Sequence, residues 1–173
     1  MIRRPPRSTP SNSSAASDVY KRQGRFAAEL GFFIGIDAAI NVLKIAKKRG
    51  IEVIRGDATS LPLKDSAFDS ALLVVTLCFL DQPERSLKEI KRILKNGGTL
   101  IVGAIPADSA LGREYLDKGE KGHPFYSAAK FYKLSEILSM LERAGFIIKR
   151  INSIRIKSEN DFVCITAKNK KEQ

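Results

Sequence analysis

Short apolar stretches alternate with amphipathic stretches from residue 24 to the end of the chain, and this alternation restricts the fold more than any other feature. Strands are expected over residues 32–36, 51–54, 68–77, 99–105, 146–156 and 161–167, and helices over residues 25–30, 38–49, 83–95 and 134–144. Residues 106–123 are polar and carry no predicted element. Strands that alternate with helices form a parallel sheet with right-handed crossovers, whereas a short turn between the last two strands indicates an antiparallel hairpin. The pattern therefore predicts an α/β fold with a mostly parallel sheet and a C-terminal antiparallel hairpin.

The first 23 residues do not share this pattern, because they are rich in Ser, Pro and Arg and have no apolar periodicity. The segment also lacks the continuous apolar core of a secretion signal. It resembles translated sequencing-adapter DNA, and the stretches PPRST and SSAASDVYKRQ carry that resemblance. A disordered basic tail is the alternative interpretation. We therefore expect residues 1–23 to be a non-native or disordered segment and residues 24–173 to form one folded domain.

Charge and cysteine content restrict the partners and the compartment. The formal net charge is +11, and the basic residues are spread among acidic ones, which is typical of a solvated surface rather than a nucleic-acid site. The longest nearly apolar stretch, residues 71–80, is too short to span a bilayer, so we expect no membrane partner. Cys78 and Cys164 lie in apolar runs without metal-ligand spacing. We therefore expect no metal site and a reducing compartment, the cytoplasm.

Two acidic residues follow consecutive predicted strands, which is where ligands bind in sheets of this kind. Asp37 follows the strand over 32–36, and Asp57 lies in a Gly-Asp-Ala turn after the strand over 51–54. The first carboxylate can accept hydrogen bonds from two ribose hydroxyls, and the second can accept one from an adenine amino group. Asp is common in turns, so either residue alone is a weak signal. The two together, with a helix between them, indicate an adenosine ligand.

Longer motifs carry a resemblance to a known family. In order along the chain they are GRFAAELG, GID, GDATSLPLKDSAFDSALLVVTLCFL and LKEIKRILKNGGTLIVG. The set resembles the class I S-adenosylmethionine-dependent methyltransferases of the type 11 group. This resemblance implies a Rossmann-like sheet with strand order 3-2-1-4-5-7-6, S-adenosyl-L-methionine as the cofactor, and methyl transfer as the activity.

The resemblance also implies which residues bind the polar parts of the cofactor. Gly24 matches the last glycine of the family's glycine-rich loop. Asp37, followed by Ala38, matches the ribose-binding acid. Asp57 and Ala58 match the pair that binds the adenine.

Three further residues are expected at the cofactor by the same resemblance. Leu43 is expected to pack against the adenine. Val75 and Thr76, at the end of the strand over 68–77, are expected to border the methionine part.

One departure from the family is large, because its first strand and the earlier glycines of the glycine-rich loop are missing here. That strand lies in the middle of the family's sheet, so its loss leaves the strands over 32–36 and 68–77 without their shared neighbour. We expect a gap between these strands rather than a direct pairing. We also expect the domain over residues 24–173 to be N-terminally truncated, and this chain to bind the cofactor weakly and to have little or no activity.

The family's reaction needs no covalent protein nucleophile, because an acceptor held in line displaces the methyl group directly. A general base helps where the acceptor is protonated. His123 and Tyr126 are the candidate catalytic residues, since they lie in the variable segment where such proteins recognise their substrates; for His123, an exposed loop residue is the alternative. The aromatic residues of this segment form either a lid or part of the core: Phe125, Tyr126, Phe131 and Tyr132. We expect the acceptor to be a small molecule.

Two other functions are weighed against methyl transfer. Tyr126 and Lys130 form a Tyr-x-x-x-Lys pair, which short-chain dehydrogenases use for proton transfer beside NAD(P). The apparent hairpin after Lys130 leaves too little chain for the remaining crossovers of that fold, which opposes this function. The other alternative is a non-catalytic or RNA-binding module with the methyltransferase fold. The basic charge permits such a module, but no basic-aromatic motif supports it.

Overall fold

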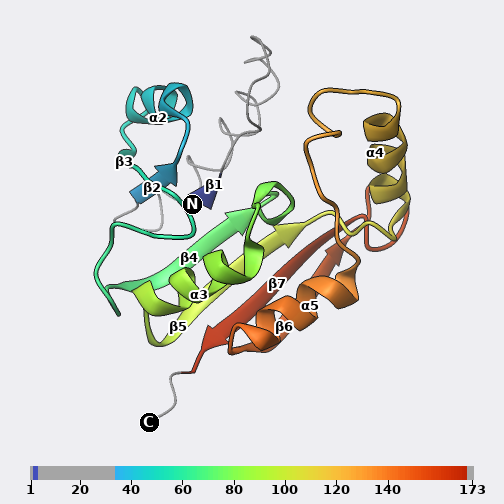
Figure 1. Ribbon diagram of the computed structural model, residues 1–173. Helices are drawn as coiled ribbons and strands as arrows, with labels where there is room; N and C mark the ends of the chain where they lie inside the picture. Colours follow the sequence, from blue (N-terminus) through green and yellow to red (C-terminus); the bar gives the residue numbers. More distant parts are fainter. Residues whose placement is uncertain (1, 4–33, 171–173) are drawn as a thin grey trace.

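The computed structural model describes residues 2–3 and 34–170, and its strands form two sheets (Figure 1). In the smaller sheet, β1 (Ile2–Arg3) pairs in parallel with β2 (Ile34–Asp37), which pairs in parallel with β3 (Glu52–Arg55). The larger sheet has the order β4-β5-β7-β6. Its strands are β4 (Phe68–Val74), β5 (Leu94–Ala104), β6 (Phe146–Ile154) and β7 (Phe162–Asn169).

The strand directions confirm the predicted α/β fold. β4 and β5 run parallel, whereas β7 pairs antiparallel with β5 and with β6, so the C-terminal hairpin is present. The orders of the two sheets, placed end to end, read 3-2-1-4-5-7-6, as the resemblance implied. The prediction that β2 and β4 do not pair directly is confirmed, because they belong to different sheets. β1, which the sequence did not predict, pairs with β2 and contacts β4. The predictions that lie outside the described residues concern Gly24, the helix over 25–30 and all of residues 1–23 except β1.

β1 was not expected from the sequence, since residues 1–23 show no strand pattern. Its two residues pair through the backbone with Ile36 and Asp37 at the end of β2. A ladder of two residues forms few backbone hydrogen bonds. A full central strand of a parallel sheet would form many more, because its residues pair with both neighbouring strands. The division of the strands into two sheets follows from this short ladder.

Two helices cover one face of the larger sheet and form the core with it. α3 (Pro83–Ile93) and α5 (Leu134–Arg143) lie side by side on that face (Figure 1). α3 has proline in its first turn and basic residues in its last turn, both of which favour a helix there. The buried apolar residues of α3 recur every three positions and belong to one apolar cluster with residues of the sheet: Leu87, Ile90, Ile93, Leu73, Leu100, Val102 and Ile165. This core fixes α3 against β4 and β5.

The helix α4 (Ala110–Glu120) lies inside residues 106–123, where the sequence predicted no element, so that prediction is wrong. Ser109 caps the helix, and its Oγ accepts a hydrogen bond from the Gly112 N–H at 2.9 Å. The helix buries residues only in its first turn, Leu111 and Gly112. A helix with so narrow an apolar contact has no periodic apolar face, which is why the pattern did not reveal it.

Two strand boundaries differ from the predicted ones by three residues or more. β4 ends at Val74 rather than at residue 77, because Val75 adopts a left-handed φ of 50° and a short 3-10 helix, η1 (Leu77–Phe79), follows. β5 begins at Leu94, directly after α3, rather than at residue 99. Periodicity alone could not place these ends, since both lie within continuous apolar or turn-like sequence.

Candidate cofactor and acceptor site

The carboxyl end of β2 holds a buried carboxylate, Asp37, of which 3% is exposed. Its Oδ1 accepts a hydrogen bond from the Ala39 N–H at 2.8 Å, which fixes the turn leading into α2 (Ile40–Lys47). Its backbone carbonyl accepts from the Gly56 N–H at 3.2 Å, which joins this turn to the end of β3. A buried carboxylate is stabilised by hydrogen-bond donors, so this position suits ligand hydroxyls.

The turn after β3 holds the second predicted acid beside the first. Asp57 Oδ1 accepts from the N–H and from the Oγ1 of Thr59, at 2.8 and 2.9 Å, and Ala58 is buried. A pocket of about 50 Å³ is lined by both turns, including Ala38, Asp57 and Ala58. The structure therefore brings the turn that follows Asp37 and the Asp57 turn to one edge of the small sheet. An ionised carboxylate can accept further bonds beyond the two from Thr59.

The remaining predicted cofactor residues also lie at element ends. Leu43 is the buried residue of α2, which packs on β2 and β3. At the end of β4, the Val75 N–H donates to the Gly103 carbonyl at 2.8 Å, and Thr76 is fully buried with its Oγ1 donating to the Val74 carbonyl at 3.1 Å. A β-branched residue at a positive φ is rare, and such strain is held only where the surroundings fix it. The chain thus turns away sharply where the methionine part is expected.

Six rings gather between α4, the segment after it and η1, and we call them the aromatic cluster: Phe79, Tyr115, His123, Phe125, Tyr126 and Phe131. The Tyr126 ring lies 4.4 Å from Tyr115 and 4.6 Å from His123, measured between centroids. Phe79, which follows β4, lies 5.1 Å from Phe125. Phe131 lies 6.0 Å from Tyr115 and lines a small cavity with Val75. The two candidate catalytic residues therefore meet in a cluster that reaches the end of β4.

The aromatic cluster is half-buried at the surface, so it is neither part of the closed core nor a separate lid. Phe79 is buried, the other benzene and phenol rings are half-buried, and His123 is exposed. The His123 Nδ1 accepts a hydrogen bond from the Phe125 N–H at 3.3 Å, so the imidazole keeps a defined place in the turn. His123 is thus both an exposed loop residue, as the alternative stated, and a neighbour of Tyr126.

Charged groups flank the aromatic cluster on α4. The Lys118 Nζ lies 5.6 Å from the Tyr115 ring and 5.8 Å from the Tyr126 ring, within the range of cation–π attraction. Hydrogen bonds from Lys118 and then Lys157 lower the pKa of Glu114 to about 2, so this carboxylate is ionised throughout the neutral range. Burial raises the pKa of the Tyr115 phenol, with Tyr126 as the next cause. Tyr115 is therefore a hydrogen-bond donor at neutral pH and not a base.

The structure does not place Tyr126 and Lys130 as a dehydrogenase would need them. Residues 124–128 form turns rather than a helix, so the two residues do not share a helical face. Tyr126 stacks on Tyr115, whereas the Lys130 Nζ lies 5.3 Å from the Tyr132 ring. The dehydrogenase alternative has no support in this geometry.

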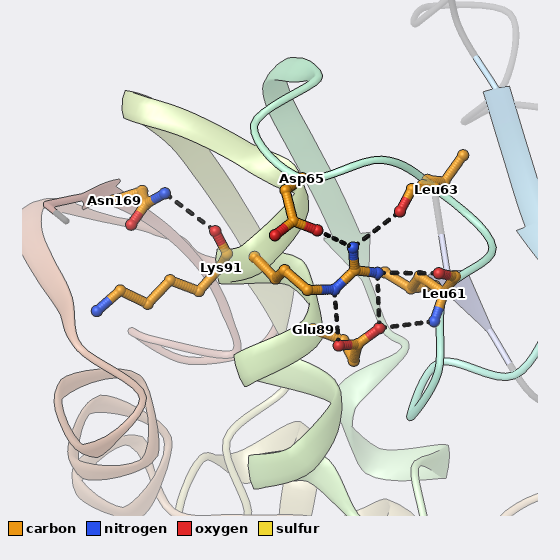
Figure 2. Close-up of polar contacts among 7 residues, drawn as sticks. Leu61, Leu63, Asp65, Glu89, Lys91 and Asn169 are labelled. Atoms are coloured by element: carbon orange, nitrogen blue, oxygen red, sulfur yellow. Dashed lines mark hydrogen bonds and ion pairs between the residues drawn. The ribbon is translucent and has the colours of Figure 1, made fainter.

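Two residues that sequence reasoning did not single out, Glu89 and Arg92 of α3, hold the chain that follows the Asp57 turn. Figure 2 shows the contacts around Glu89 and the carbonyls of Leu61 and Leu63. Both residues lie within the motif LKEIKRILKNGG, which was the available signal, but the pattern could not reveal what they contact.

Asp161 is a further residue that the sequence did not reveal. Its fully buried carboxylate accepts hydrogen bonds from the N–H groups of Leu111, Lys157 and Ser158, at 3.0, 2.6 and 2.6 Å, and from the Ser158 Oγ. Burial raises the pKa of Asp161, but these hydrogen bonds outweigh it and lower the pKa below its usual range. The β6–β7 turn is thereby tied to the start of α4, which carries part of the aromatic cluster.

Within residues 2–3 and 34–170, no helix is long and apolar enough to cross a membrane. In the same part of the chain, no three His, Cys, Asp or Glu side chains gather as a metal site would require.

Comparison with known proteins gives concordant results. The family described as "Methyltransferase domain" matches residues 18–102. The structure resembles an S-adenosylmethionine-dependent methyltransferase of Thermotoga maritima, described as a "possible histamine N-methyltransferase", with a TM-score of 0.76 and 41% identity over 85% of this chain and 77% of that chain. An uncharacterized protein of Methanocaldococcus jannaschii is 37% identical over 83% of this chain and 77% of its own length. A demethylmenaquinone methyltransferase of Renibacterium salmoninarum is 37% identical over 40% of this chain and 30% of its own length.

Proposed function

Because the chain belongs to the class I S-adenosylmethionine-dependent methyltransferases, we propose that it methylates a small molecule bound between the end of β4 and the aromatic cluster. Its cofactor is S-adenosyl-L-methionine, which supplies an electrophilic methyl group when bound. One observation carries the proposal. Two carboxylates, the buried Asp37 and the less buried Asp57, lie at the ends of neighbouring strands, and the aromatic cluster lies beyond the end of β4.

The residues of the three strand ends fit the cofactor by their chemistry. Asp37 supplies a buried acceptor for ribose hydroxyls, and Asp57 supplies an acceptor for an adenine amino group. The apolar side chains of Leu43 and Ala58 suit the faces of the adenine. These assignments follow the family resemblance residue by residue, and those of Gly24, Ala38, Val75 and Thr76 are proposed on the same ground.

The aromatic cluster favours a small acceptor with a flat or cationic part. Half-buried rings offer π-faces for stacking and for cations, and Lys118 already uses two of them. Two similar proteins carry the names of small acceptors, histamine and demethylmenaquinone, which supports a small molecule in this chain as well.

The chain's own contribution to the chemistry is positioning and, for a protonated acceptor, removal of a proton. The aromatic cluster excludes water from one side of the acceptor and orients it. The imidazole of His123 is proposed as the general base, with Tyr126 beside the ring. Its Nδ1 holds the free lone pair and accepts from the Phe125 N–H, so this hydrogen bond has to be released before Nδ1 takes the proton of the acceptor. Tyr115 can donate a hydrogen bond to the acceptor, because its raised pKa keeps the phenol protonated.

Calorimetry with S-adenosylmethionine and S-adenosylhomocysteine tests the cofactor site. Asp37→Ala and Asp57→Ala should each weaken binding, by about 1–3 kcal/mol, because a ligand donor is left without its acceptor. Asp69→Ala is the matched control, since Asp69 is an exposed acid on β4 that pairs with Lys95. NAD binding without S-adenosylmethionine binding would contradict the proposal.

Transfer of a labelled methyl group tests the acceptor class. The panel contains small amines, phenols and quinols in one arm, and RNA and protein in two others. We expect label in the small-molecule arm. Label in RNA or protein alone would contradict a small acceptor, and cofactor binding without any transfer would favour the non-catalytic module.

A further inference from the structure

The 57–65 loop, which joins the Asp57 turn to β4, has little regular structure of its own. Its internal contacts are short-range: the Ser60 N–H donates to the Asp57 carbonyl at 3.1 Å, and the Leu63 N–H donates to the Leu61 carbonyl at 2.8 Å. A segment of isolated turns retains many accessible conformations unless other parts of the fold fix it. The contacts that fix this loop come from α3.

Arg92 supplies most of these contacts through its guanidinium. Its Nη2 donates to the Leu61 carbonyl at 2.9 Å, and its Nη1 donates to the Leu63 carbonyl at 2.8 Å and to Asp65 Oδ1 at 2.5 Å. The planar fork of arginine matches two carbonyls two residues apart, a geometry that a lysine ammonium cannot reproduce. One side chain of α3 therefore holds the loop at three residues.

Glu89, one turn before Arg92 on α3, completes the attachment. Its Oε2 accepts from the Leu61 N–H at 2.8 Å, and its two oxygens accept from the Nη2 and Nε of Arg92 at 2.9 Å each (Figure 2). The hydrogen bond from Arg92 lowers the pKa of Glu89 despite partial burial. Leu61 is thus bound at both its N–H and its carbonyl, and its side chain is buried.

The attachment reaches the cofactor residues through Pro62, which lies between the two carbonyls held by Arg92. A Cβ placed on Gly56 would lie 3.0 Å from Pro62 Cδ and 3.1 Å from Ile36 Cγ2, so these three residues are in close contact. Gly56 directly precedes Asp57, and Ile36 directly precedes Asp37. Displacement of Pro62 would therefore remove packing from both turns that carry the acids.

From these contacts we propose that Glu89 and Arg92 are positioning residues for the adenosine end of the cofactor site, which they act on through the 57–65 loop and Pro62. This inference rests on the proposed function for the identity of the ligand. It also explains why the motifs GDATSLPLKD and LKEIKRILKNGG occur together, since each supplies one side of the same contact.

Variants of the pair and a matched ion pair separate positioning from general stability. Arg92→Ala removes every side-chain contact of Arg92 but leaves the bond between the Leu61 N–H and Glu89, and Arg92→Lys keeps the charge but not the fork. Glu89→Gln keeps an acceptor for the Leu61 N–H, whereas Glu89→Ala does not. Lys95→Ala is the control, because Lys95 lies just past α3 and forms an exposed pair with Asp69 at 2.7 Å that touches no cofactor turn.

The first measurement is hydrogen exchange without cofactor, at a temperature well below the melting transition of every variant. Arg92→Ala should speed exchange of the amides of residues 59–61 and 63 while leaving those of β5 unchanged, and Lys95→Ala should leave both unchanged. Unchanged exchange in residues 59–61 and 63 overturns the inference. This outcome does not depend on whether the chain binds a cofactor.

The second measurement is the Kd of S-adenosylhomocysteine. Arg92→Ala and Arg92→Lys should raise it by about tenfold, the change expected when one hydrogen-bonding interaction is lost. Glu89→Gln should bind more tightly than Glu89→Ala, and Lys95→Ala should bind like the unmodified chain. Where turnover is measurable, KM for the cofactor should rise with little change in kcat.

The outcomes distinguish the inference from the proposed function. An unmodified chain that binds S-adenosylhomocysteine, with Arg92 variants that bind equally well, overturns the inference and leaves the function intact. An unmodified chain that binds neither cofactor form contradicts the proposed function for this chain, and hydrogen exchange then decides alone whether Glu89 and Arg92 hold the loop.

Discussion

Asn169, at the end of β7, offers a sharp test of how the larger sheet holds α3. Its fully buried side chain donates from Nδ2 to the carbonyls of Lys91, Leu94 and Lys95, at 3.0, 2.9 and 3.1 Å. Figure 2 shows it beside Lys91. These carbonyls belong to the end of α3 and the start of β5. The last carbonyls of a helix have no hydrogen-bond donor within the helix and need one from outside it. Asn169 therefore caps the helix on which Arg92 lies.

The expected loss of folding stability depends on which groups each substitution leaves without a hydrogen-bond partner. Asn169→Leu keeps the branched shape of the side chain, although leucine is larger, and removes the donor. The buried Leu94 carbonyl then loses its side-chain partner, at a cost of about 1–3 kcal/mol. Part of this cost is offset, because the Asn169 Oδ1 has no hydrogen-bond partner among the described residues and the leucine removes it. Asn169→Asp places a carboxylate against carbonyl oxygens and should cost more, about 3–5 kcal/mol, as for an unpaired buried charge.

Thermal and urea unfolding measure both variants, with Asn152→Leu on the exposed side of β6 as the control. At about 2–4 °C per kcal/mol for a chain of this size, Asn169→Leu should lower Tm by about 2–12 °C. The deficit of Asn169→Asp should be larger at pH 7 and shrink toward pH 4, since protonation removes the unfavourable charge. Equal stability of the leucine and aspartate variants would refute the role of the amide as a donor.

Four further results are expected. Asp161 has a lowered pKa in the folded chain, so the stability it supplies is present above the usual Asp range and is lost as pH falls through and below it; Asp161→Asn should be less stable at pH 7 and show a flatter acid limb in unfolding followed by circular dichroism. Gly112→Ala should destabilise the chain and loosen α4 in hydrogen exchange, because the added Cβ would lie 1.9 Å from the Pro106 carbonyl oxygen, whereas Gly122→Ala, where the added Cβ meets nothing, should cost only about 1 kcal/mol for its positive φ. Tyr126→Ala should raise KM for the acceptor while leaving the Kd of the cofactor unchanged, since the ring lies in the aromatic cluster; a changed cofactor Kd would contradict the separation of the two subsites. Replacing residues 1–23 with the segment that precedes the matching residues of the Thermotoga maritima relative should give a larger Tm rise with S-adenosylmethionine than this chain shows, and an equal rise would mean that such a segment adds nothing to cofactor binding.

The sequence by itself determined the elements whose signals are local. Apolar runs with turn residues at their ends located β2, β3, β4, β6 and β7, and the proline and basic residues of α3 marked its two ends. It also determined that Asp37 and Asp57 follow consecutive strands, and parallel strands carry such positions to one edge of a sheet. These features depend on neighbours along the chain, which a pattern records.

Only the tertiary structure decided which distant groups meet. α4 has a narrow apolar contact, and its first turn is held by Asp161. The carboxylate of Asp161 accepts a hydrogen bond from the N–H of Leu111, which lies 50 residues earlier in the chain. Phe125 meets Phe79, and Tyr126 meets Tyr115, only because α4 and the turns after it fold back over η1. Arg92 reaches the Leu61 carbonyl 31 residues earlier in the chain because packing of α3 on the sheet brings its last turn beside the 57–65 loop. Hydrogen bonds of this kind depend on distances across the fold, and no spacing along the sequence contains that information.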